Sequence, residues 1–387
     1  MNGILNGIRV LDLSRYIAGP YCGVLLADMG AEVIKVEKLN GGDETRTLGP
    51  WKDGTSLYFP GYNRNKKSVT VNFRTPEGIA LIKKLVDTAD VVLENFRTGT
   101  MKKMGLDYES LKEINPKIIM VSVTGFGQTG PCSTKAAFDN IISAMSGVAR
   151  TTPRGIATGR GAMHDFMAAM YAAYGIALAL YERNQTGKGQ YIDVGMYASS
   201  AMLRSVAIAD YAMNGEFAFE DKDDSAPYGY IPTKDGWLAF HAGTDPMYSR
   251  LLTVIDDPIL HDPKYQDVVV RVEECDTLVQ VVAKWASDKT STEIEKIFDA
   301  AQIPVGAVAT PKTLLNSAHL RETGHIVNVP INGLGEVPFC GFPFTMSEHQ
   351  QIEYRKAPDL GENNEEIYEE LGLSKKEITE LRRKKII

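Results

Sequence analysis

The chain has only four cysteines, Cys22, Cys132, Cys275 and Cys340, and they lie far apart. They form no CxxC pair, so the common zinc-binding spacing is absent and no disulfide framework is expected. The six histidines do not cluster either, and we therefore expect no metal centre. Residues 14–20 contain one glycine where a dinucleotide-binding turn would carry three, and Gly-x-x-x-x-Gly-Lys-Ser/Thr is also missing. These absences argue against NAD(P) and ATP enzymes, and no nicotinamide or flavin is expected.

The chain also lacks an excess of positive charge and long uninterrupted apolar runs. The net charge of -7 gives no electrostatic reason to expect nucleic acid or an anionic membrane as a partner. No apolar run reaches the roughly 18–20 residues of a membrane span without polar interruption. The opening MNGILNGIRVLDL leads straight into a strand pattern and lacks the regions of a signal peptide. We therefore expect a cytoplasmic protein without membrane or nucleic-acid partners.

The first half of the chain alternates between β-rich runs and helical patterns. Strands are expected at residues 8–13, 31–36, 69–73, 91–95, 118–124 and 191–194, and helices at 19–29, 76–89, 108–114, 166–181 and 198–213. This alternation predicts an α/β fold in which helices cover both faces of a parallel sheet. Ligands of such sheets bind at the carboxyl ends of the strands.

The length of 387 residues is enough for two domains of ordinary size. An acidic segment at 215–226, followed by Pro227, predicts a linker between a large domain, 1–214, and a small α+β domain, 227–325. The small domain is expected to contain a hairpin of strands 229–232 and 236–240 and helices at 246–255, 276–287 and 292–300. A final segment, 326–387, ends in a helix with the capping box Ser374-x-x-Glu377.

Asp165 stands directly before the long apolar stretch 166–181 and follows the loop Gly159-Arg160-Gly161. Its carboxylate is therefore expected near the first turn of a helix. Unpaired backbone N–H groups there would keep it ionised and hold its oxygens in place, as a nucleophile or base requires. The same position also suits an aspartate that only caps a helix. Position alone leaves both roles open.

Further motifs surround this aspartate. In chain order they are Val10-Leu11-Asp12-Leu13 with Ala18-Gly19-Pro20, Gly30-Ala31-Glu32-Val33-Ile34-Lys35-Val36-Glu37, Asn63-Arg64-Asn65-Lys66-Lys67-Ser68, Glu94-Asn95-Phe96-Arg97, Gly125-Phe126-Gly127-Gln128-Thr129-Gly130-Pro131, and Asp165 followed by an apolar helix, Ala179-Leu180-Tyr181-Glu182-Arg183 and Thr186-Gly187-Lys188-Gly189-Gln190. Together they resemble the class III CoA-transferase family of the CaiB/BaiF superfamily, which contains formyl-CoA transferase and carnitine CoA-transferase. The resemblance covers nearly the whole chain.

The resemblance implies a Rossmann-like large domain with a smaller inserted domain, a final segment that returns to the large domain, and an interlocked homodimer. Asp165 falls where the family keeps its catalytic aspartate. The implied reaction moves CoA from an acyl-CoA donor to a free carboxylic acid through an aspartyl anhydride and an aspartyl-CoA thioester. Coenzyme A then enters as part of the substrate, and no metal is required.

The resemblance also implies contacts with CoA. These fall on Arg15, Tyr16, Lys38, Val71, Asn72, Phe73, Arg74, Asn95, Phe96, Arg97, Lys103, Lys135, Ala136, Ala137 and Phe138. Lys38 and Lys103 stand where the formyl-CoA enzyme has arginines, so the charge is kept but the bidentate fork is lost. His164 is a candidate substrate contact. His241 and Gly243 correspond to a glycine-rich loop over the aspartate, and with one glycine left, any lid is expected to be less mobile or differently shaped.

Three alternatives remain beside intermolecular transfer. An α-methylacyl-CoA racemase on the same scaffold would need a histidine base, but the matching stretch reads Ala137-Phe138-Asp139-Asn140, so only His164 could substitute. Intramolecular CoA transfer within a dicarboxylate would use Asp165 in the same way. A non-enzymatic CoA-binding protein would use Asp165 only as a cap.

Overall fold

The computed structural model describes residues 3–152, 155–157, 161–215, 225–349 and 352–387. The chain divides into two compact units, and each is described by itself. Unit 1 comprises Met1–Arg204 and His319–Ile387, and unit 2 comprises Ser205–Ala318. The predicted linker lies mostly outside the described residues, as do Gly159 and Arg160 of the loop expected before Asp165.

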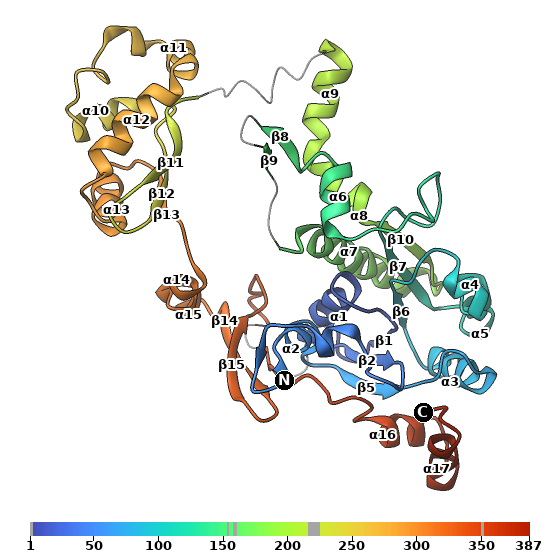
Figure 1. The fold of residues 1–387 in the computed structure, drawn as a ribbon. Coiled ribbons are helices and arrows are strands. Elements are labelled where there is room, and N and C mark those ends of the chain that lie inside the picture. Colours follow the sequence, from blue (N-terminus) through green and yellow to red (C-terminus); the bar gives the residue numbers. More distant parts are fainter. Residues whose placement is uncertain (1–2, 153–154, 158–160, 216–224, 350–351) are drawn as a thin grey trace. The chain divides into compact units, whose positions relative to one another are not determined.

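A six-stranded parallel sheet forms the centre of unit 1 (Figure 1). Its order is β10-β7-β6-β1-β2-β5, with β1 Arg9–Asp12, β2 Glu32–Glu37, β5 Lys67–Thr70, β6 Val91–Glu94, β7 Ile119–Thr124 and β10 Tyr191–Gly195. All five strand pairs are parallel. The chain runs outward from β1 in one direction through β2 and β5 and then in the other through β6, β7 and β10. Such a reversal, here between β1 and β6, is where sheets of this type bind ligands.

Hydrophobic side chains alternate between the two faces of the sheet, and each face has its own core. On one face Leu11, Ile34 and Val92 belong to a cluster with residues of α3 (Pro76–Asp87), α5 (Tyr108–Ile114), α16 (Asn364–Glu370) and α17 (Lys375–Arg383). On the other, Val10 and Val33 pack with α1 (Ala18–Asp28) and α7 (Met163–Thr186). The predicted α/β fold with helices on both faces of a parallel sheet is therefore confirmed.

The remaining elements of unit 1 are short. They are η1 Glu44–Thr47, β3 Trp51–Lys52, β4 Thr55–Ser56, α2 Tyr58–Asn63, α4 Thr100–Met104, α6 Asp139–Met145, β8 Arg150–Thr152, β9 Gly155–Ala157, α8 Met196–Ala201, η2 Met202–Arg204, β14 Ile326–Ile331 and β15 Gly335–Cys340, with α15 Ala318–Glu322 at the boundary of the units. The capping box of Ser374 and Glu377 is present at the start of α17, as predicted.

The single helix expected at 198–213 is wrong. The structure has α8, the 3-10 turn η2 and α9 (Ser205–Asn214) in its place. The hydroxyls of Ser199 and Ser200 donate to the carbonyls of Gly195 and Met196, four residues back. Such bonds compete with the helix ladder and bend it, which explains a break that the apolar periodicity does not show.

Unit 2 is a small α+β unit. After α9 it contains β11 Tyr228–Pro232, β12 Trp237–His241, α10 Asp245–Val254, η3 Pro263–Gln266, α11 Val268–Glu273, α12 Cys275–Ala286, α13 Ser291–Ala300, β13 Val305–Ala307 and α14 Pro311–Leu315. The predicted hairpin is present as the antiparallel pair of β11 and β12, and β13 adds a third strand to it. The core of this unit is formed by residues such as Leu238, Leu251 and Phe298.

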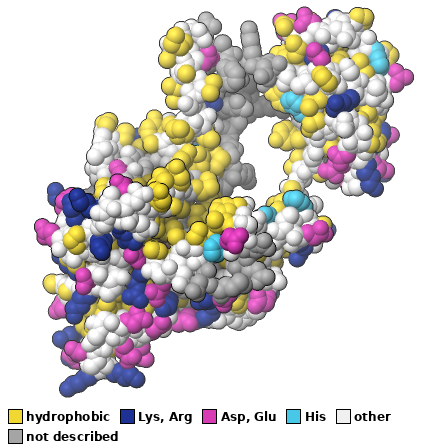
Figure 2. Space-filling model, turned by 180° about the vertical axis from the view of Figure 1, so that it is seen from behind, with side chains coloured by type: hydrophobic (Ala, Val, Ile, Leu, Met, Phe, Trp, Pro, Cys, Tyr) yellow, Lys and Arg dark blue, Asp and Glu magenta, His cyan; other side chains and the backbone are white. Residues whose placement is uncertain are grey.

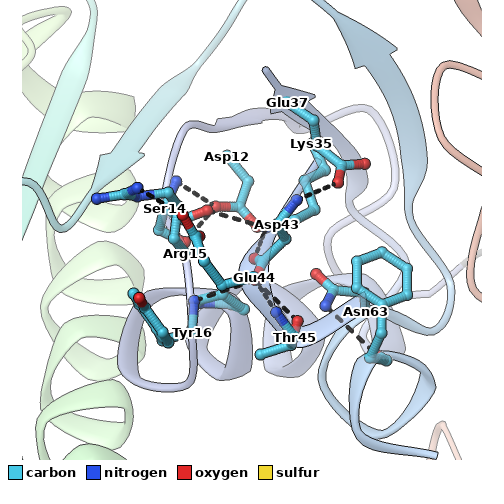
Figure 3. A network of polar contacts seen from close by, with 12 residues as sticks. Asp12, Ser14, Arg15, Tyr16, Lys35, Glu37, Asp43, Glu44, Thr45 and Asn63 are labelled. Carbon is cyan, nitrogen blue, oxygen red and sulfur yellow. Dashed lines mark hydrogen bonds and ion pairs between the residues drawn. The ribbon is translucent and has the colours of Figure 1, made fainter. Parts of the chain in front are cut away.

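Two buried ion pairs lie at the carboxyl ends of β1 and β2. Figure 3 labels Asp12, Lys35 and Asp43 of these pairs. Lys66 Nζ lies 2.8 Å from Asp12 Oδ2, and Lys35 Nζ lies 2.8 Å from Asp43 Oδ2. The side chains of Lys66 and Asp12 are fully buried. Burial opposes the ionised form of Asp12, yet the charges of Lys66 and Lys35 hold its pKa below the usual range. The network therefore joins strand ends and loops that lie far apart in the chain.

Asp12 and Lys35 also hold the loop that follows β1. Asp12 Oδ1 accepts hydrogen bonds from the backbone N–H and the hydroxyl of Ser14, and Lys35 Nζ donates to the Ser14 carbonyl at 2.9 Å. Asp43 Oδ1 accepts from the Tyr16 N–H at 3.3 Å. Tyr16 itself has φ +65°, a conformation that costs energy in a residue other than glycine. The network thus fixes the direction in which residues 14–16 leave the sheet.

Replacing Lys66 by methionine should destabilise the protein by about 3–5 kcal/mol, because Asp12 would remain as a buried charge without its partner. The measurement is urea unfolding at pH 7. The matched control is Lys52→Met, whose ion pair with Asp53 is mostly exposed, and it should change the stability by less than about 1 kcal/mol. Equal effects of the two substitutions would contradict the role given to the buried pair.

Candidate active site

The loop after β1 is tied to the end of β6 across the reversal point of the sheet. The Asn95 side chain donates from Nδ2 to the Arg15 carbonyl at 2.6 Å, and its Oδ1 accepts from the Arg15 N–H at 2.8 Å. Gly19 allows the loop to turn tightly, because a Cβ atom there would lie 2.2 Å from the Ser14 Cβ. The Asn95 side chain therefore forms the two hydrogen bonds to the Arg15 backbone that a neighbouring strand would otherwise form. Through them it fixes the position of Arg15 at this site.

A second loop crosses the end of β7. A Cβ atom on Gly125 would lie 2.3 Å from the Ala137 Cβ, so glycine is needed for residues 135–138 to pass this close to the sheet. The loop leads into α6, which begins at Asp139. Phe138, next to it, is 68% exposed and has its ring centroid 6.3 Å from that of Tyr16. The loops after β1 and β7 thus meet over the strand ends.

The N-terminus of α7 is held by Asp139 rather than by Asp165. The Asp139 Oδ1 atom accepts hydrogen bonds from the backbone N–H groups of His164, at 2.8 Å, and of Asp165, at 3.4 Å. Ala162, in the N-cap position, contributes no side-chain bond. The capping interpretation of Asp165 therefore does not hold for its own helix, because another carboxylate already occupies those N–H groups.

The carboxylate of Asp165 instead meets the start of α1. The backbone N–H of Ala18, the first residue of that helix, acts on this carboxylate and lowers its pKa. Helix N-termini stabilise negative charge through their unpaired N–H groups. The sequence predicted contact with a helix N-terminus, and the structure supplies it from a different helix, about 150 residues earlier in the chain.

Asp165 lines a cavity of about 750 Å³ at the ends of β1, β6 and β7. Many of the residues predicted to contact CoA line the same cavity. They are Arg15, Tyr16, Asn95, Phe96, Arg97, Lys135, Ala136, Ala137 and Phe138. The structure therefore brings together in one place the predicted nucleophile and side chains from three separate motifs.

Burial raises the pKa of Asp165 to about 7, and the negative charge of Asp139 adds to this effect. The Ala18 N–H acts in the opposite direction but does not outweigh them. The sequence predicts that a helix N-terminus favours the ionised form of Asp165, and in the structure burial and Asp139 oppose that effect. The sequence could not show the competing causes, because both come from residues distant in the chain.

An aromatic cluster next to Asp165 contributes to this burial. The rings of Tyr21 and Phe166 have centroids 4.5 Å apart, and Tyr58 and Tyr62 have centroids 5.1 Å apart. Burial raises the pKa of Tyr58, and the negative charge of Asp165 raises it further. Tyr58 also lines the cavity. These rings reduce the water around Asp165 and strengthen electrostatic interactions there.

Two of the predicted CoA contacts share one carboxylate. Arg15 Nη1 and Lys38 Nζ lie 2.9 and 2.8 Å from the Glu44 Oε1 atom. The Arg15 guanidinium also lies 5.4 Å from the centroid of the Phe96 ring. Glu44 thus pairs with two cations that could also bind an anionic ligand.

Lys38 belongs to a second cavity, of about 520 Å³, at the ends of β2 and β5. It is lined by Lys38, Leu39, Asn40, Val71, Asn72, Phe73, Arg74 and Lys385, which include the predicted run 71–74. The strand expected at 69–73 ends early, at Thr70, because the Asn72 N–H bonds to the carbonyl of Ile386 instead of continuing the sheet. Glu44 connects the two cavities through Arg15 and Lys38.

Four predicted residues lie elsewhere. Lys103 is exposed on α4 and lines neither cavity. The ring of His164 is buried, and its Nδ1 atom lies 2.7 Å from the Ser200 hydroxyl, which itself donates to Met196 O. The hydroxyl must then accept, so Nδ1 carries the proton and His164 joins α7 to α8. The structure thus gives His164 a packing role rather than a substrate contact.

The other two, His241 and Gly243, belong to unit 2. The His241 ring stacks on Tyr228, with centroids 5.3 Å apart. Arg271, which is fully buried, donates to the Gly243 carbonyl at 3.3 Å and forms an ion pair with Asp245 at 2.5 Å. A Cβ atom on Gly243 would lie 2.7 Å from Ser225 Cβ. Glycine is therefore required here by close packing against Ser225.

Sequence reasoning missed Asp139, Tyr58 and Glu44 as members of this region. In the sequence Asp139 belongs to a stretch that lacks a histidine, and no periodicity shows that it faces the start of α7. The contacts of Glu44 could not be predicted, because Arg15 and Lys38 lie on different loops. In the described part of the chain, no group of three His, Cys, Asp or Glu side chains is placed to hold a metal ion.

The helix α7 is, by length and composition, apolar enough to cross a membrane, a test that buried core helices also pass. Ala168, Ala172 and Ile176 are buried against the sheet. Its other side exposes Met170, Tyr171, Tyr174, Leu178 and Tyr181. Figure 2 shows hydrophobic side chains gathered on one face of unit 1.

Comparison with known proteins gives consistent matches over the whole chain. The sequence model of CoA-transferase family III matches residues 5–364. Succinyl-CoA–D-citramalate CoA-transferase from Chloroflexus aurantiacus is 37% identical over 99% of this chain and 98% of its own length. Human succinyl-CoA:glutarate CoA-transferase is 34% identical over 96% and 87%. The crystal structure of a CaiB/BaiF family protein from Brucella suis matches with a TM-score of 0.86 and 32% identity, over 96% of this chain and 100% of that one.

The pKa of Asp165 should fall when Asp139 is replaced by asparagine. The amide oxygen can still accept from the N–H groups of His164 and Asp165, but the repelling charge is gone. Carbon NMR of aspartate-labelled protein, with Asp165→Asn to assign the resonance, should show a midpoint near 7 in the parent protein and a lower one in Asp139→Asn. The control Asp107→Asn, at the start of α5, should leave the midpoint unchanged. An unchanged midpoint in Asp139→Asn would contradict the coupling.

Proposed function

The chain belongs to CoA-transferase family III, and from this membership we propose that it transfers CoA through a covalent intermediate on Asp165. It is a class III CoA-transferase, acting between an acyl-CoA and a free carboxylate. The observation that carries the covalent mechanism is the place of Asp165. Its carboxylate lines the cavity, does not cap its own helix, and lies at the start of α1 beside loops from three motifs.

The reaction is a series of exchanges at carbonyl carbons. A carboxylate oxygen of Asp165 attacks the donor thioester, the C–S bond breaks, and a mixed anhydride and CoA thiolate form. The thiolate attacks the aspartyl carbonyl and releases the donor acid, which leaves an aspartyl-CoA thioester. The acceptor carboxylate then attacks this thioester to form a second anhydride and free the thiolate again. The thiolate takes the acceptor acyl group, and Asp165 returns as a carboxylate without any net proton transfer.

The surroundings of Asp165 suit this sequence of steps. Only the ionised carboxylate is a nucleophile, so the reactive fraction rises as pH rises through about 7. The aromatic cluster keeps water from the anhydride, which water would otherwise hydrolyse. The Ala18 N–H favours the ionised form of the carboxylate at the cavity. Asp139 acts as a positioning residue, since it fixes the backbone of Asp165.

CoA is proposed to lie along the strand ends, with its thioester at Asp165 and its phosphates at the basic residues. Arg15, Arg97 and Lys135 line the first cavity, and Lys38 and Arg74 line the second. Phosphates bind to such side chains by charge-assisted hydrogen bonds. Glu44 would have to release Arg15 or Lys38 when phosphate binds.

The relatives named above use succinyl-CoA, and we propose succinyl-CoA as the donor. The acceptor is proposed to be a dicarboxylic acid, as the same names suggest. Intramolecular transfer would use the same chemistry. The racemase alternative is less favoured, because Phe138 lines the cavity without a transferable proton and His164 is bonded to Ser200.

A second copy of the chain is proposed to cover the exposed face of α7. That face carries three tyrosines, a methionine and a leucine, types that are frequent at protein interfaces. A tyrosine hydroxyl is costly to place in lipid without a partner, which favours a protein over a membrane at this helix. The interlocked homodimer implied by the resemblance would bury such a face.

Asp165→Asn should lower the rate of CoA transfer from succinyl-CoA by at least about a thousandfold, because the amide cannot form the anhydride. Hydroxylamine added during turnover should label Asp165 of the parent protein as a hydroxamate, detected by mass spectrometry of peptides. Asp107→Asn serves as the control and should retain both activity and labelling. Undiminished transfer by Asp165→Asn would exclude the mechanism, and α-proton exchange without CoA transfer would favour racemisation.

In solution the protein should have twice the mass of the 42.5 kDa chain, measured by light scattering after gel filtration. Tyr174→Lys with Leu178→Lys should reduce the assembled fraction, because two charges would enter the proposed interface. Lys substitutions at the exposed Ile259 and Val269 of unit 2 are the matched control and should leave the mass unchanged. A monomer of the parent chain at micromolar concentration would contradict the proposed assembly.

A further inference from the structure

Lys385 lines the second cavity although it lies outside every motif of the family. It follows α17, which ends in the basic residues Arg382 and Arg383, and cations at a helix C-terminus interact favourably with the helix dipole. The structure separates Lys385 from these residues. Lys385 faces the cavity shared by Lys38 and Arg74, whereas Lys384 is near Glu380, at 3.6 Å, and does not line the cavity.

The backbone around Lys385 is firmly held. The N–H groups of Lys385 and Ile386 donate to the carbonyls of Arg382 and Leu381, the pattern of a helix that ends in a Schellman motif. Lys385 has φ +56°, in the position where such motifs usually have glycine. The motif therefore fixes the backbone from which the Lys385 side chain extends.

The segment is also fixed from the side of the sheet. Asn72 N–H donates to the Ile386 carbonyl at 2.8 Å, and Asn72 Nδ2 donates to the Lys385 carbonyl at 3.2 Å. Ile386 and Ile387 are buried in the core on that face. The backbone of Lys385 is therefore placed at the loop 71–74 by bonds and by packing.

The charges at this cavity favour an anion. Lys38 is paired with Glu44. Arg74 and Lys385, in contrast, form no ion pair with any residue that the structure describes, although both line the cavity. Strands of a sheet lie ~4.8 Å apart, so the end of β7 and the end of β5 are separated by roughly 19 Å. That span suits a long ligand with its thioester near Asp165 and a further anionic group beyond β2.

We propose that Lys385, together with Arg74, binds the 3′-phosphate of the CoA ribose and so distinguishes CoA from 3′-dephospho-CoA. The ligand identity rests on the proposed function. The 3′-phosphate is a terminal dianion at the end of CoA opposite the thiol, and two unpaired cations match its charge. Its removal leaves the diphosphate, whose partners lie nearer to Arg15, unchanged.

The test measures the dissociation constants of CoA and 3′-dephospho-CoA by titration calorimetry on the full chain. The parent protein should bind CoA about tenfold more tightly, as one charge-assisted contact allows. Lys385→Met should weaken CoA binding by about tenfold and leave 3′-dephospho-CoA binding unchanged. Lys385→Arg should keep the preference, and Lys384→Met is the matched control that should behave like the parent.

An equal loss for both nucleotides in Lys385→Met, or equal affinities in the parent protein, would overturn the proposal. The thermal midpoint of Lys385→Met identifies a variant that fails to fold, and in that case Lys385→Gln gives the same comparison. These outcomes differ from failure of the proposed function. If Asp165→Asn still transfers CoA while Lys385→Met loses the preference, only the covalent mechanism fails.

Discussion

The buried pairs of Lys66 with Asp12 and of Lys35 with Asp43 are the interactions on which the rest of the site depends. Strand ends offer polar backbone groups but no fixed path for the loops that leave them. Here two ammonium groups and two carboxylates occupy the carboxyl ends of β1 and β2, and the loop 14–16 is bonded to them. Because each charge is buried, each needs its partner, and the loop has one favoured course.

From this fixed loop the site is assembled by backbone contacts. Asn95 bonds to Arg15 across the reversal point of the sheet, and the Asp139 carboxylate bonds to the start of α7. In both cases a side chain bonds to backbone groups that have no backbone partner within the strand or helix. The nucleophile is thereby held by elements that are far apart in sequence, and its carboxylate remains directed at the cavity rather than used for capping.

The alternation of patterns in the sequence was enough to predict the sheet, its parallel strands and the helices on both faces. It was also enough to place Asn95, Phe96 and Arg15 at strand ends, where the structure brings them to one cavity with Asp165. What it could not predict depends on contacts between distant residues. The raised pKa of Asp165 comes from burial and from Asp139, and the ring of His164 forms a hydrogen bond with Ser200, 36 residues away.

Local effects hidden within a helix were missed for a similar reason. Residues 198–213 have the composition of a single helix, yet two serine hydroxyls bond back to helix carbonyls just before a 3-10 turn that begins at Met202. The lysine in a left-handed conformation at 385 likewise has no signature in composition. At positions of this kind the structure departs from what local sequence preferences predict, and such departures are common at functional sites.

A pKa near 7 on Asp165 links ligand binding in the cavity to the number of protons that the protein binds. A carboxyl group with this pKa is only partly ionised near neutral pH. A ligand that prefers the carboxylate must release the bound protons to the buffer as it binds. Its measured heat of binding would then include the ionisation enthalpy of the buffer, and acid would weaken its binding by mass action.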